Sequence, residues 1–86
     1  MNTIWLLAGR YDGLPTVPLD KVREDFFGGM TKPVFTKKVE SGEIPLPVTT
    51  LGSSQKAPRV IHLTDLAAYL DGCADKARKE LERKVR

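Results

Sequence analysis

Between Pro18 and Asp71 the chain combines helix-like and strand-like patterns in a definite order. Two short amphipathic segments are separated by the glycine pair Gly28-Gly29, and two strand-like runs then flank a polar loop before a third helical segment. Glycine suits the left-handed conformation at a helix C-terminus, so the pair is expected to be a tight turn between two helices. The order predicts an α+β fold in which a helix pair, a β-hairpin and a further helix share one core.

The inner faces of the helix pair follow from the spacing of apolar residues. Leu19, Val22 and Phe26 recur at three- and four-residue intervals in the first helix. Phe35 and Val39 form the inner face of the second helix, which is expected to start after Thr31 as N-cap and to end at Gly42. Its proline is tolerated because it falls in the first turn.

The strand-like runs are less regular. The run Ile44 to Leu51 contains two prolines, which cannot donate ladder hydrogen bonds, so an edge or irregular strand is expected. Gly52 to Pro58 is a loop by composition, and Val60 to Leu63 is the return strand. Thr64 is expected to cap the third helix, and Asp71-Gly72 to close it.

The N-terminal segment is nearly continuous in apolar residues, so its periodicity leaves helix and strand open. Asn2 or Thr3 can cap it, and it ends at Asp12-Gly13. Val17 is expected to be extended, because it precedes a proline.

The chain after the predicted break, Cys73 to Arg86, reads as a separate charged helix. We therefore divide the chain into a main domain, 1–72, and a C-terminal element, 73–86. A narrow apolar stripe on this helix predicts either a homodimer or docking against the body of the same chain. The stripe consists of Ala74, Ala77, Leu81 and Val85.

Length and composition limit the remaining choices. A chain of 86 residues holds one core, and its net charge of +3 is compatible with nucleic acid. One cysteine and one histidine exclude an internal disulfide and a zinc site built by this chain. The apolar run Ile4 to Ala8 is too short for a membrane span or a signal-peptide core, so a cytoplasmic protein without a cofactor is expected.

The order of elements is that of a small winged helix-turn-helix, in which the second helix of the pair enters the major groove of duplex DNA. Lys32 and Lys37 can then contact phosphates or guanine edges, and Thr36 a base edge or a thymine methyl. Thr31 lies at the same N-terminal end, and Lys38 is expected to reach a flanking phosphate. A solvated lysine face is the alternative interpretation.

The loop between the two strands contains no acidic residue and is expected to be the wing. Its polar and basic side chains suit contact with the DNA backbone or minor groove, because phosphates attract cations and accept hydrogen bonds. An ordinary exposed hairpin is the alternative. The predicted wing residues are Ser53, Ser54, Gln55, Lys56 and Arg59.

Catalysis is not expected. His62 lies in an apolar run without a second histidine, and the carboxylates of the first helix lie on its solvated side. The sequence contains no phosphate-binding glycine loop and no nucleophile motif.

Three motifs, together with their spacing, resemble the pyocin activator protein family of bacteria and their phages. They are YDGLPTVPLDKVREDFF, then VESGEIPLPV, then SQKA followed by HLTDLAAYLD. The resemblance extends from Thr3 to Asp71 and is weaker in the tail. It implies a small transcriptional activator that binds DNA upstream of phage-tail-like bacteriocin genes. A broader similarity is to excisionase and MerR-like winged helices.

The leading hypothesis is therefore a sequence-specific activator whose partners are double-stranded DNA and, for one route to activation, bacterial RNA polymerase. Two alternatives stay open from the sequence. One is an excisionase-like architectural protein that bends or coats DNA. The other is a protein-interaction module that uses the C-terminal helix, with the lysines serving only solubility.

Overall fold

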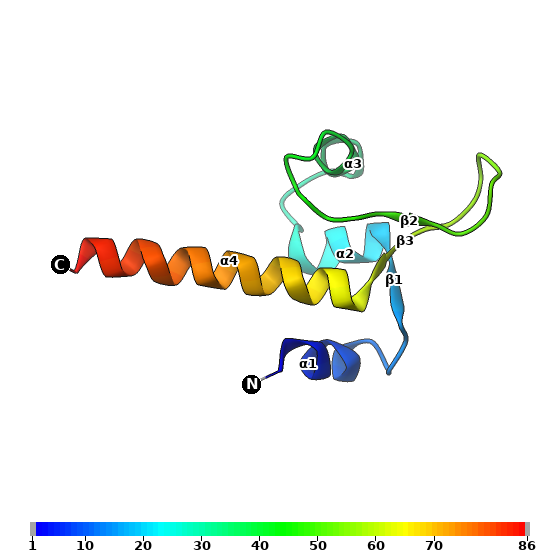
Figure 1. Ribbon diagram of the computed structural model, residues 1–86. Coiled ribbons are helices and arrows are strands. Elements are labelled where there is room, and N and C mark those ends of the chain that lie inside the picture. The colour runs from blue at the N-terminus through cyan, green and yellow to red at the C-terminus, as the bar shows by residue number, and fades with distance from the viewer. Residues whose placement is uncertain (1, 86) are drawn as a thin grey trace.

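The computed structural model of the protein describes residues 2–85 and has the predicted α+β class (Figure 1). Four helices and a small antiparallel sheet make up the described part of the chain. In chain order the elements are α1 (Thr3–Arg10), β1 (Thr16–Pro18), α2 (Leu19–Phe26), α3 (Lys32–Glu40), β2 (Thr49–Thr50), β3 (Arg59–His62) and α4 (Leu63–Lys84).

The sheet has the strand order β1-β3-β2, so the short extended piece around Val17 forms its third strand. Val17 pairs with Ile61, and both side chains are buried at the centre of the core. The predicted hairpin is present, but its first strand is reduced to Thr49–Thr50. The preceding segment is irregular as its prolines require, and it still buries Ile44 and Leu46.

The helix pair packs as predicted through Phe35 and Val39, but one aromatic position was predicted wrongly. Phe26 is 38% exposed, whereas Phe27 packs against the core with its ring centroid 5.0 Å from that of Phe35. The reason is that α2 ends at Phe26. Phe27 takes a non-helical conformation as the C-cap and turns its ring inward.

The predicted helix break at Asp71-Gly72 is wrong, because α4 is one continuous helix from Leu63 to Lys84. A glycine inside a helix costs only about 1 kcal/mol relative to alanine, and the flanking alanine, leucine, lysine and glutamate residues are strong helix formers. The N-cap is His62 and not Thr64, whose hydroxyl lies 3.0 Å from the His62 Nδ1. As a result α4 extends well beyond the body of the molecule (Figure 1).

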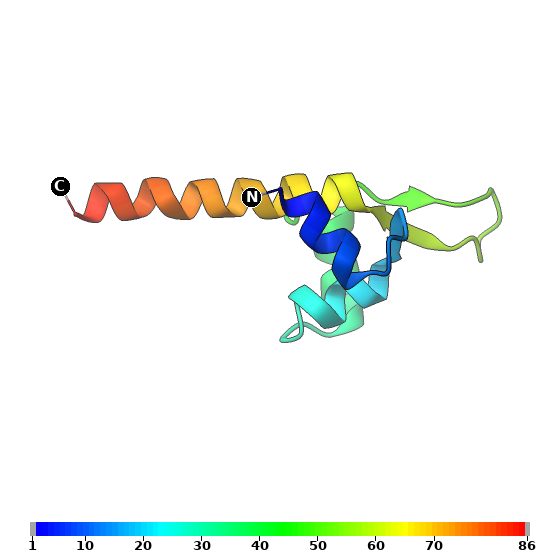
Figure 2. The same cartoon turned by 90° about the horizontal axis from the view of Figure 1, so that it is seen from below.

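The N-terminal segment is a helix, and Asn2 caps it by accepting a hydrogen bond from the Ile4 N–H at 3.1 Å. Figure 2 shows α1 lying across the N-terminal half of α4. At its end, the Tyr11 hydroxyl donates to Asp25 of α2 at 2.6 Å. That hydrogen bond and the nearby Arg10 and Lys21 hold the pKa of Asp25 below its usual range.

We expect Tyr11→Phe to lower the melting temperature at neutral pH by removing this link. Burial, followed by the bond to Asp25, raises the pKa of Tyr11 from 10.0 to about 12. The stabilisation is therefore complete below pH 10 and is lost as the pH rises towards 12. The difference in melting temperature between wild type and variant should shrink across that range. A difference that does not depend on pH would contradict the assignment.

Candidate nucleic-acid interface

The turn between α2 and α3 is held by the Arg23 side chain. Its Nε donates to Asp20 at 2.8 Å, and its Nη1 donates to the Met30 carbonyl oxygen at 3.0 Å. The hydrogen bond from Arg23 is also the main reason that the pKa of Asp20 lies below its usual value. The guanidinium thus holds the chain just before α3 against α2. This contact helps to fix the orientation of α3 relative to α2.

Helix α3 presents an exposed lysine at each end, Lys32 in its first turn and Lys37 in its last. Lys32 and Lys37 are exposed, and neither forms an ion pair within residues 2–85. Thr31 occupies the N-cap position as predicted, but its side chain makes no capping hydrogen bond. Its hydroxyl and both ammonium groups are therefore available to an external partner.

Lys38 differs from these two lysines. It is half-buried, and its Nζ lies 2.9 Å from Glu43 Oε2 just after the end of α3. A contact between Lys38 and a phosphate would have to compete with this carboxylate, so it can contribute less than the exposed lysines.

The predicted wing is a hairpin that projects away from the body beyond β2 and β3 (Figure 1). The Leu51 N–H donates to the Pro58 carbonyl oxygen at 2.8 Å and closes the loop at its base. Gly52 has φ +107°, which L side chains rarely adopt, so this position favours glycine. All four polar residues at the tip are exposed, namely Ser53, Ser54, Gln55 and Lys56.

The base of the wing is tied to α3 by an ion pair. Arg59 Nη1 lies 3.2 Å from Glu40 Oε1 at the last residue of α3. Both side chains are exposed to solvent, so the pair adds little stability, and its main effect is to reduce the positive charge of Arg59.

Between α3 and the sheet end of the wing lie two adjoining hollows of about 300 and about 280 Å³. Leu19, Thr36 and Arg59 line both of them. Thr36 is half-buried there, so its side chain faces the wing and not the fully exposed side of α3. The structure therefore brings Lys32, Thr36 and Arg59 together around one concave surface.

Three polar residues of this surface are not among the predicted contacts. Asp20 lines the first hollow, and Glu40 and Thr50 line the second. Thr50 is opposite Arg59 in the β2–β3 pairing, which a hairpin register could have indicated. The pairing of Glu40 with Arg59 joins residues 19 positions apart, and no local pattern predicts it.

We expect Glu40→Gln to strengthen binding to duplex DNA several-fold, because it removes a negative charge from this surface and frees Arg59 to contact a phosphate. Glu80→Gln makes the same change of charge on the distant part of α4 and is the matched control. Gel-shift titrations of both variants at one salt concentration measure the effect. Equal affinities for the two variants would contradict this role for Glu40.

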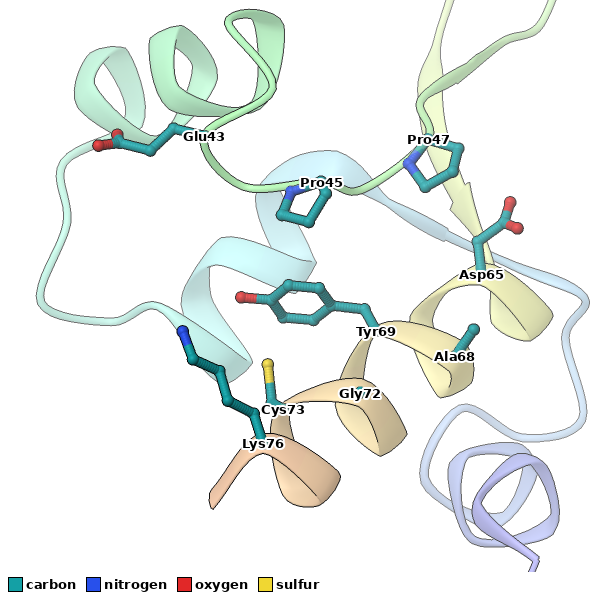
Figure 3. Close-up of a pocket in the computed structure, with 9 residues that line it drawn as sticks. All are labelled: Glu43, Pro45, Pro47, Asp65, Ala68, Tyr69, Gly72, Cys73 and Lys76. Carbon is teal, nitrogen blue, oxygen red and sulfur yellow. The ribbon is translucent and has the colours of Figure 1, made fainter. Parts of the chain in front are cut away.

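A second groove of about 640 Å³ lies between α4 and the segment that follows α3 (Figure 3). Figure 3 shows the Tyr69 ring projecting from α4 toward Pro45. Burial, followed by a hydrogen bond with Cys73, raises the pKa of Tyr69. The groove contains none of the predicted DNA-contacting residues.

The predicted C-terminal stripe is mostly uncovered. Ala74 is half-buried, Ala77 is exposed, and Leu81 and Val85 are 60% and 74% exposed. Docking of these turns against the body of the same chain is therefore not observed, which leaves self-association as the open prediction.

Residues 2–85 also bear on membrane and metal binding. No helix in this part of the chain combines the length and the apolar character that crossing a bilayer requires. Within the same residues, no cluster of histidine, cysteine and carboxylate side chains is arranged to hold a metal ion.

The fold and the surface define a small α+β protein in which a helix pair and a basic hairpin face a common hollow. The family described as Pyocin activator protein PrtN matches residues 3–77. The chain belongs to this pyocin activator family, as its motifs predicted. No curated protein and no solved structure matches the chain.

Proposed function

We propose that the protein is a sequence-specific DNA-binding transcriptional activator of phage or phage-tail-like bacteriocin genes. In this proposal α2 and α3 form the helix-turn-helix, and the β2–β3 hairpin is the wing. The protein acts in the cytoplasm by binding, without catalysis. Its membership of the pyocin activator family supports the regulatory role.

One observation carries the DNA-binding part of the proposal. Lys32 of α3 and Arg59 at the base of the wing line the same hollow, and Arg23 holds the turn that leads into α3. Lys37 and Lys56 add exposed cations on α3 and at the tip of the wing. Phosphates require spaced cations and hydrogen-bond donors, and base edges require a helix that reaches into the groove. The arrangement offers both kinds of contact from one surface.

Selection of bound fragments from bacterial genomic DNA, followed by footprinting, tests the proposal. We expect one recurring sequence, located upstream of phage-like genes, and activation of a reporter placed behind it. Cooperative footprints over several sites with DNA bending and no activation would instead support an architectural role. Absence of duplex binding at low salt would refute the DNA-binding function.

We expect Lys56→Ala to reduce the slope of log affinity against log salt concentration by about one, since one phosphate contact releases about one counterion. Arg59→Ala should change the slope less, because Glu40 already neutralises much of its charge. Gel-shift titrations over a range of salt concentrations measure both slopes. Wild-type slopes in both variants would rule out a phosphate contact by the wing.

A further inference from the structure

The apolar face that α4 packs against α1 continues into the C-terminal half of α4, where it is largely uncovered. Leu63 and Ala67 are buried and Leu70 is half-buried, and α1 crosses this part of the helix (Figure 2). The Thr3 hydroxyl donates to Asp71, so the start of α1 marks where this cover ends. The same three- and four-residue spacing then continues through the half-buried Ala74 to the exposed Ala77, Leu81 and Val85.

Nothing in residues 2–85 lies against the C-terminal turns of α4. Every residue from Asp75 to Val85 is exposed, and Figures 1 and 2 both show these turns projecting from the body. The uncovered stripe, Ala74 to Val85, spans about 17 Å at about 1.5 Å per residue. An isolated helix end of this kind leaves two large apolar side chains in water.

We propose that this stripe pairs with the same stripe of a second copy of the chain, with the two α4 helices antiparallel. The proposal goes beyond the DNA-binding function and does not depend on it. The pairing places Leu81 against the partner's Ala77, and Val85 against the partner's Ala74.

The sizes of the side chains favour the antiparallel direction. The stripe has two small residues at its N-terminal end and two large ones at its C-terminal end. Antiparallel pairing puts a large side chain opposite a small one in each layer, which fills space evenly. Parallel pairing would place alanine opposite alanine and leave voids between the helices.

The charges beside the stripe lead to the same orientation. At about 100° per residue, Arg78 and Glu82 lie on the same flank of the stripe, one helical turn apart. Two helices that cross antiparallel near residue 80 bring Arg78 opposite the partner's Glu82, and Glu82 opposite the partner's Arg78. Two opposite-charge pairs then flank the apolar layers. In each pair Arg78 shares its guanidinium between the partner's Glu82 and its own Asp75, whose Oδ1 lies 2.9 Å from Arg78 Nη1.

The position of α1 argues against the parallel direction. Packed helices have axes about 8–10 Å apart. In a parallel pair, both copies of α1 would have to fit between the two α4 helices, because each α1 covers the same face up to Asp71. In the antiparallel pair, the partner helix occupies only the uncovered stripe and ends near the start of α1.

Sedimentation velocity of the full chain without DNA tests the proposal. Three turns of helix make a small interface, so we expect a monomer–dimer equilibrium with a dissociation constant in the micromolar range.

Leu81→Asp should remain monomeric up to at least tenfold higher concentration, and its melting curve should match that of the wild-type monomer because Leu81 is exposed. Lys79→Asp changes the far side of α4 and should still dimerise. A wild-type protein that stays monomeric at high micromolar concentration, or a Leu81→Asp variant that dimerises normally, would overturn the proposal.

Charge reversal and cross-linking test the orientation. Arg78→Glu or Glu82→Arg alone should weaken the dimer about tenfold, and the double variant should restore it. In a Cys73→Ser background, a mixture of Ala77→Cys and Leu81→Cys chains should form the mixed disulfide faster than either variant forms its own. Faster formation of the two like disulfides, or no restoration by the double charge reversal, would refute the antiparallel pairing.

Discussion

Replacing both exposed lysines of α3 in the double variant Lys32→Ala/Lys37→Ala should weaken binding to the selected operator on the order of 100-fold. A contact with a guanine edge contributes about 1–3 kcal/mol, and each 1.4 kcal/mol is about tenfold in affinity. Neither lysine forms an ion pair within residues 2–85, so the loss should appear in binding and not in folding.

Gel-shift titration against the operator and against an unrelated duplex measures this effect. The double variant Lys76→Ala/Lys79→Ala removes the same charge from α4 and is the matched control. We expect the control to lose affinity only slightly and to keep its preference for the operator. Equal losses in the two double variants would mean that net charge, and not the face of α3, determines binding.

Phe35→Ala should remove a large part of the stability of the domain. Phe35 is 1% exposed and contacts Phe27 at the junction of α2 and α3. Loss of a fully buried phenylalanine side chain costs about 3–5 kcal/mol, which is a large part of the 5–15 kcal/mol typical of a folded domain. Phe26→Ala makes the same change at a 38% exposed site and should cost about 1 kcal/mol or less.

Urea denaturation followed by circular dichroism compares these two phenylalanine variants. A midpoint that falls far more for Phe35→Ala than for Phe26→Ala would support the packing of the helix pair. Similar midpoints would contradict the assignment of Phe27 and Phe35 to the core and of Phe26 to the surface.

The parts of the fold that could be predicted depend on local patterns. The spacing of Phe35 and Val39, the turn at Gly28-Gly29 and the irregular run around Pro45 each reflect short-range geometry, and the structure has all three. The turn forms without the expected left-handed conformation, since neither of its glycines has a positive φ. The exposed side of Lys37 follows from the same helical period, whereas Lys32 is exposed as the first residue of α3. Their contacts with DNA stay a prediction.

The features that could not be predicted depend on contacts between distant segments. Val17 becomes a strand only because Ile61 lies beside it, and Arg59 is partly neutralised only because the fold brings Glu40 near. The helix continues through Gly72 because strong helix formers on both sides outweigh one unfavourable residue. An Asp-Gly pair on its own indicates the end of a helix. Its effect can be judged only against the helix propensity of all the residues in α4.

The continuity of α4 has a mechanical consequence. A break at Gly72 would have let the C-terminal turns rotate relative to the rest of the protein. In the unbroken helix their orientation about the helix axis is fixed. The angle about the α4 axis between the exposed stripe and the surface between α3 and the wing is then set by the number of residues between them, at about 100° per residue. Inserting a single residue after Gly72 would therefore rotate the distal stripe by more than a quarter of a circle while leaving both ends chemically intact.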